Sequence, residues 1–127
     1  MKIEDLGGAA IASSDQELEK ALAKRYGQGV NQFWLTHEGR EYPTLAILVN
    51  GDLCSLNYFP KPDDPGYVSC SQRNGLDPSG MSMFYLSVDE EQEVPNDTVV
   101  SFAEALAAAK EFRKSAQHPA AIDWTEL

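Results

Sequence analysis

Apolar positions near the start of the chain predict a helix. They recur at intervals of three to four residues from Leu18 to Tyr26, the spacing of one helix face. Ser14 and Glu17 stand three positions apart just before this run, as in a capping box. Gly27 follows it, where a helix C-cap belongs. We therefore expect a helix between Ser14 and Gly27, preceded by a flexible leader over residues 1–13.

Alternation with a period of two predicts strands in the next part of the chain. Phe33 and Leu35 alternate with Gln32, Trp34 and Thr36, so an aromatic residue lies on the second face of this strand. The segment 44–49 is apolar, which suits a buried strand. Asn50-Gly51 then predicts a type I′ hairpin, because both central positions of that turn need positive φ. The expected pairs are Leu48–Leu53, Ile47–Cys54 and Leu45–Leu56.

The second half of the chain predicts further strands and a second helix. We expect a short strand at Tyr67-Val68, a strand over 81–88 and an acidic connection over 89–95. Ser101 and Glu104 form a second capping box at the head of an alanine-rich helix. Ile122 and Trp124, beyond Pro119, should fold back over the core. The fold class is α+β: a mainly antiparallel sheet of about five or six strands, flanked by an N-terminal and a C-terminal helix.

Composition narrows the class of protein. The 127 residues, 43% of them hydrophobic, can bury the core of one domain spanning 1–127 and are too apolar for a disordered chain. No run approaches the ~20 apolar residues of a membrane span, and the acidic N-terminus does not resemble a signal peptide. We therefore expect a cytoplasmic protein that contacts no membrane.

Net charge favours a basic protein as the partner. Twenty acidic residues against ten basic ones give a net charge of −10. Such a surface repels phosphate backbones, so we expect no direct binding to nucleic acid. It attracts a basic protein and accelerates the encounter. The alternative explanation is that the charge merely keeps the protein soluble.

No arrangement of residues indicates catalysis. His37 and His118 lie far apart in sequence, and neither has a Cys or a second His at metal-ligand spacing. No glycine-rich loop opens a helix after a strand, so a phosphate-binding motif is absent. We expect a non-enzymatic protein without metal or cofactor. A small carboxylate-dependent hydrolase remains open, because acids are abundant, although it would need one buried carboxyl.

Two clusters of acids are candidates for a protein contact. One is Asp63 and Asp64, in a proline-stiffened loop, and the other is Asp89, Glu90, Glu91 and Glu93. Dense like charge costs stability that a basic partner would recover. The alternative is a solvated loop without a partner. Nearby aromatic residues can anchor an interface, and we select Tyr58 and Tyr67 as the candidate anchors.

Short motifs in both halves of the chain resemble a known family. The chain closes with Pro119, Ile122, Trp124 and Glu126, which match a pattern of proline, an aliphatic residue and Trp-x-Glu. The run 93–101, the last helix, Phe33-Trp34-Leu35-Thr36 and the hairpin also fit. In these motifs, which lie between about Leu18 and Leu127, the sequence resembles immunity protein family 1 of bacterial polymorphic-toxin systems. It is most similar to members that neutralise DNA cytosine deaminase toxins.

The resemblance implies an antitoxin. It would bind a cognate toxin domain and cover the active-site cleft, which in a nucleic-acid-acting toxin is basic and can accept acidic loops in place of phosphates. Toxin binding would then involve Tyr58, Asp63, Asp64, Tyr67, Asp89, Glu90, Glu91 and Glu93. An adaptor or chaperone for a secreted effector is the other non-enzymatic alternative, since it would bind its partner without inhibiting it.

Overall fold

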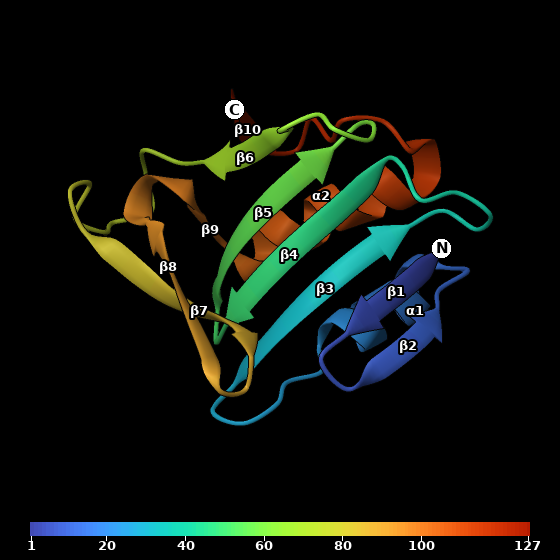
Figure 1. The fold of residues 1–127 in the computed structure, drawn as a ribbon, viewed down its shortest axis with the longest axis horizontal. Coiled ribbons are helices and arrows are strands. Elements are labelled where there is room, and N and C mark those ends of the chain that lie inside the picture. The colour runs from blue at the N-terminus through green and yellow to red at the C-terminus, as the bar shows by residue number, and fades with distance from the viewer.

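A single antiparallel sheet organises the molecule. The computed structural model describes all 127 residues, and Figure 1 shows two helices behind the sheet and a two-stranded ribbon in front of it. The elements in chain order are β1 (Lys2–Asp5), β2 (Gly8–Ile11), α1 (Asp15–Leu22), β3 (Val30–Thr36), β4 (Thr44–Asn50), β5 (Leu53–Phe59), β6 (Tyr67–Cys70), β7 (Met81–Ser87), β8 (Glu90–Pro95), the 3₁₀ turn η1 (Asn96–Thr98), β9 (Val99–Ser101), α2 (Phe102–Ser115) and β10 (Asp123–Glu126).

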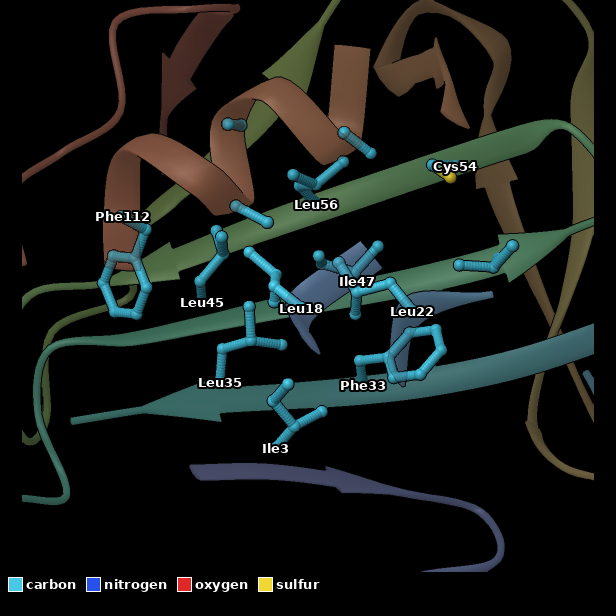
Figure 2. Packing of buried hydrophobic residues seen from close by; sticks show 14 of the residues in the cluster. Ile3, Leu18, Leu22, Phe33, Leu35, Leu45, Ile47, Cys54, Leu56 and Phe112 are labelled. Carbon is cyan, nitrogen blue, oxygen red and sulfur yellow. The ribbon is translucent and has the colours of Figure 1, made fainter. Parts of the chain in front are cut away.

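The core lies between the sheet and the helices. The strands follow the order β10-β6-β5-β4-β3-β1-β2, with β9 paired to β5 and the β7–β8 ribbon separate. Because side chains alternate along a strand, one face of β3, β4 and β5 is apolar and meets α1 and α2. Figure 2 shows these side chains, among them Ile3, Leu18, Leu22, Phe33, Leu35, Leu45, Ile47, Leu56 and Phe112. The predicted α+β class is confirmed.

The strand number was underestimated, because the short strands β1, β2, β9 and β10 of the main sheet and β8 of the ribbon were not expected. The main sheet has eight strands where five or six were expected, and the acidic connection over 89–95 is in fact β8. In the ribbon β8 pairs only with β7, placing Glu93 opposite Met83 and Glu91 opposite Tyr85. Four of its six residues are exposed in a row, so no buried face produces an alternating pattern.

The expected flexible leader is also wrong, because residues 2–11 form the hairpin β1–β2. Ile3 is buried in the core, and β1 pairs with β3. The Asp5 carboxylate accepts hydrogen bonds from the backbone N–H groups of Gly7 and Gly8 and so closes the turn. Four-residue strands with one buried apolar position in β1 carry too little periodicity to be recognised from sequence.

The first helix starts as predicted and ends early. Ser14 caps it by accepting a hydrogen bond from the Glu17 N–H, but α1 ends at Leu22 and not near Gly27. Tyr26 has left the helix: its N–H donates to the carbonyl oxygen of Val30 at 2.8 Å, forming a bridge that leads directly into β3. Tertiary pairing here overrides the apolar spacing.

The central hairpin forms with its register moved by two residues. Ile47 faces Leu56 and Val49 faces Cys54, so the turn residues are Gly51 and Asp52 and not Asn50-Gly51. Gly51 has φ of 61°, whereas Asp52 has no positive φ, which is typical of a type II′ turn. A shift of two residues leaves every side chain on its expected face, and the core assignment survives the error.

The C-terminal predictions are confirmed. The capping box of α2 is complete, with Ser101 and Glu104 each bonding the other's backbone N–H. Ile122 is buried in the core, and Trp124 packs against it while its indole N–H donates to the carbonyl oxygen of Pro119 at 2.7 Å. Neither helix is long and apolar enough to cross a membrane.

Gly66 is required where the loop between β5 and β6 approaches β5. Its φ is 78°, and a Cβ there would lie 2.4 Å from the carbonyl oxygen of Tyr58. Gly75 has almost the same φ, 77°, with no atom within 4 Å of its Cβ position. We predict that Gly75→Ala costs about 1–2 kcal/mol of unfolding free energy from φ alone, and Gly66→Ala clearly more. Urea unfolding measures both, and equal losses would contradict the predicted clash.

Candidate functional site

The β7–β8 ribbon stands on the face of the sheet that the helices leave free. Asn50 points to this face, because its neighbour Val49 points into the core, and its side-chain amide donates to the carbonyl oxygen of Met83 at 3.0 Å. Phe84 is fully buried where β7 crosses β3 and β4. The ribbon is therefore held firmly over one end of this face, and Figure 1 shows it crossing there.

The exposed acids of the second predicted cluster lie together on this ribbon. Asp89 is in its turn, and Glu90, Glu91 and Glu93 lie along β8, all exposed to solvent. Between positions 74 and 109 the chain has no Lys, Arg or His, so no base on this segment neutralises them. Beside the ribbon is a hollow of about 340 Å³ that includes Tyr85, Val88, Asp89 and Glu91 in its lining. It can accept a basic side chain.

The first predicted cluster is separate from the second. Asp63 is exposed at φ of 63°, in the loop between β5 and β6, while the Asp64 carboxylate accepts the Gly66 N–H at 2.7 Å. This loop follows Phe59, which pairs with Thr44, whereas the ribbon crosses the opposite end of the same strands. The structure does not bring the two clusters into one patch, and Asp64 already has a role in the loop.

Neither predicted tyrosine is a free anchor. Tyr58 is 6% exposed and belongs to the core, where its ring stacks on His118 at 4.7 Å between centroids. Tyr67 is half-buried and lies 4.4 Å from the same imidazole. The two tyrosines lie on the adjacent strands β5 and β6 and pack against the C-terminal segment, where Trp124 completes the aromatic cluster around His118. Tyr58 therefore has almost no exposed surface to offer a partner.

Two other aromatic residues occupy the free face, and the prediction of site residues missed them. Trp34, 40% exposed, and Phe59 flank β4 with their rings stacked at 6.4 Å and 15°. They belong to the lining of a hollow of about 570 Å³ that also includes Glu4, Glu41 and Tyr42. The alternation of β3 does place Trp34 on the second face. Its stacking on Phe59, however, follows only from the register of the sheet.

The two layers of the molecule differ in charge. The helical segments 15–25 and 102–115 hold five acids and six bases, so the rest of the chain holds fifteen acids and four bases. The excess of negative charge therefore lies entirely outside the helical segments. A basic partner is attracted to the sheet and ribbon side more strongly than to the helices.

Cys54 and the two histidines are engaged in packing. The His37 Nε2 bonds to the carbonyl oxygen of Phe112 at 2.9 Å, and burial lowers the pKa of His37. Burial likewise lowers the pKa of His118. Cys54 lies in the core, where burial raises its pKa to about 12 and keeps the thiol protonated. No three His, Cys, Asp or Glu side chains are grouped to hold a metal ion.

Comparison with known proteins identifies the family. Residues 7–126 match the family described as Immunity protein Imm1. The chain belongs to this family. It is also 29% identical over 128 residues to the double-stranded DNA deaminase immunity protein of Burkholderia cenocepacia (strain H111), with 100% of each chain covered. The resemblance carried by the closing Pro-Ile-Trp-Glu pattern is thus confirmed, and this Imm1 protein is an immunity protein.

Proposed function

We propose that this Imm1 protein binds a DNA-acting deaminase toxin in the cytoplasm and inhibits it without catalysis of its own. The observation that carries the proposal is the acidic ribbon of an immunity protein whose full-length relative is named for a double-stranded DNA deaminase. A deaminase that acts on DNA must hold phosphates in a basic cleft. Carboxylates at the edge of the ribbon take the place of those phosphates and exclude the DNA.

The charges of the molecule support a contact through the ribbon side. Asp89, Glu90, Glu91 and Glu93 repel one another in the free protein, and a basic cleft relieves that repulsion. Their carboxylates are exposed, so binding does not require the fold to open. Asp63 adds negative charge at the other end of the same strands and does not belong to the ribbon contact.

The test is inhibition by the purified chain. Candidate DNA deaminase domains are co-expressed with it in bacteria, and the domain against which it protects is then assayed for cytosine deamination on double-stranded DNA. We expect the chain to form a stable complex with that domain and to abolish deamination at equal concentration. The ribbon variant Asp89→Asn, Glu90→Gln, Glu91→Gln, Glu93→Gln should need a higher concentration for the same inhibition.

The same assay separates the other functions. A complex that forms while deamination continues unchanged would indicate an adaptor or chaperone and would contradict the proposal. Protection without a complex, lost when single carboxylates are replaced, would indicate a hydrolase. If a complex forms and protects, and no carboxylate substitution weakens it, the antitoxin function stands but the ribbon is not the contact.

A further inference from the structure

The pair Trp34 and Phe59 is the feature of the free face that the acidic ribbon does not account for. Across the sheet, Trp34 lies opposite Ala46, and Phe59 lies opposite Thr44. The two rings therefore lie on either side of β4 and stack above its short side chains, Ala46 and Thr44, which are only 8% and 7% exposed. A large aromatic side chain 40% exposed on a sheet is not needed for the core, which lies on the other face.

We infer that Trp34 and Phe59 form an aromatic platform that receives an arginine side chain of the toxin. This inference rests on the proposed function. A guanidinium group is planar, stacks on an indole ring and still donates hydrogen bonds at its edges. Glu41, at the rim of the same hollow, offers a carboxylate acceptor. Arginine, tryptophan and tyrosine are also the residues most enriched among the dominant contacts of protein interfaces.

The rim of the hollow is itself balanced in charge. Lys2 is paired with Glu4 at 2.8 Å, and Arg40 precedes Glu41 on the same loop. A cation is therefore held there by the ring faces and by hydrogen bonds to Glu41, while the attraction that brings it close comes from the fifteen acids outside the helical segments. The platform should stabilise the formed complex, and the ribbon should accelerate its formation.

The platform and the ribbon lie within the reach of one partner. Val30, which helps to line the acidic hollow beside the ribbon, and Trp34 are four residues apart on β3, about 13 Å at the rise of a strand. A protein interface of ordinary size covers about 800 Å² on each partner. A toxin seated against the acidic hollow thus extends over the platform as well, because both lie along the same face of the sheet.

The first experiment compares binding kinetics of Trp34→Ala with the wild-type chain, using the deaminase domain against which the wild type protects. We expect dissociation about tenfold faster or more, with the association rate and its salt dependence nearly unchanged. Trp34→Phe keeps an aromatic ring, so its dissociation rate should increase much less. Phe102→Ala is the matched control, because Phe102 is a half-buried aromatic residue that lies on α2, in the helical layer behind the sheet. It should bind as the wild type does.

The second experiment identifies the occupant and does not depend on how Trp34→Ala folds. The chain has two tryptophans, so labelling with 5-fluorotryptophan gives two ¹⁹F signals, from Trp34 and Trp124. Adding the unlabelled toxin domain should shift the Trp34 signal and leave Trp124 in place. Replacing the toxin's surface arginines by alanine, one at a time, should produce one variant in which Trp34→Ala has no further effect, since the pair acts together.

The outcomes distinguish the inference from the proposed function. If the wild-type chain forms no inhibitory complex with any deaminase domain, the proposed function fails. If it does, and Trp34→Ala dissociates as slowly as the wild type with an unchanged Trp34 signal, the platform is wrong while the function stands. A shifted Trp34 signal with no coupled arginine would show a contact of another chemistry and would overturn the arginine assignment.

Discussion

Neutralising the ribbon acids is expected to slow association with the toxin on the order of tenfold at low salt. The variant carries Asp89→Asn, Glu90→Gln, Glu91→Gln and Glu93→Gln, which preserve side-chain shape. These carboxylates are exposed and lie on one segment without bases, so they dominate the local field that steers a basic partner. Stopped-flow binding measured over a range of salt concentrations should give a slower rate and a flatter salt dependence.

A control of equal charge separates the ribbon from the net charge of the molecule. Asp63, Asp123, Glu126 and Glu38 are exposed and lie outside the ribbon, and neutralising them also changes the net charge from −10 to −6. The control should lose much less of the association rate. If both variants slow association equally, only the total charge matters and the ribbon is not the contact.

Removing the Phe112 ring is expected to cost about 3–5 kcal/mol of unfolding free energy. Phe112 is fully buried in α2, where its ring contacts His37 at 4.9 Å and Tyr58 at 6.2 Å between centroids. Its carbonyl oxygen also bonds the His37 imidazole, so this position joins α2 to the segment after β3. A typical domain has only about 5–15 kcal/mol to lose, and Phe112→Ala should be folded only marginally. Urea unfolding followed by circular dichroism measures the loss.

Phe102→Ala is the matched control on the same helix. Phe102 is half-buried at the start of α2, with the Arg25 guanidinium 4.8 Å from its ring centroid. The same atoms are removed from a site that water and the arginine side chain can refill, so the loss should be clearly smaller. Equal losses for both variants would show that α2 is not anchored through Phe112.

The elements that sequence predicted best are those determined by neighbouring residues. Ser101 and Glu104 form the capping box of α2 within one turn, and the apolar face of β4 is evident from its own composition. The strand β8 was missed because Glu90, Glu91 and Glu93 stabilise no core and show no alternation. The register of the central hairpin depended on whether Asn50 or Gly51 opens the turn, which dipeptide preference alone does not decide.

The residues of the candidate site also divide into those that the local sequence predicts and those that only the fold brings together. The ribbon acids are neighbours in sequence, so their cluster was predicted without knowledge of the fold. Trp34 and Phe59 lie 25 positions apart in sequence. They stack across β4 because β4 lies between β3 and β5 in the sheet. Tyr58 was selected because it is aromatic and lies near an acidic loop, but the alternation of β5 turns it into the core. Choosing between the adjacent residues Tyr58 and Phe59 required knowing on which face of β5 each side chain lies.

Hydrogen–deuterium exchange of the chain, free and bound to the toxin domain, tests the central claim most directly. That claim is that the ribbon and the free face of the sheet contact the toxin while the helices face solvent. We predict slower amide exchange over β7–β8 and around Trp34 and Phe59 in the complex. Amide exchange in α1 and α2 should be unchanged. Protection confined to α1 and α2, with the ribbon exchanging as in the free protein, would contradict the account.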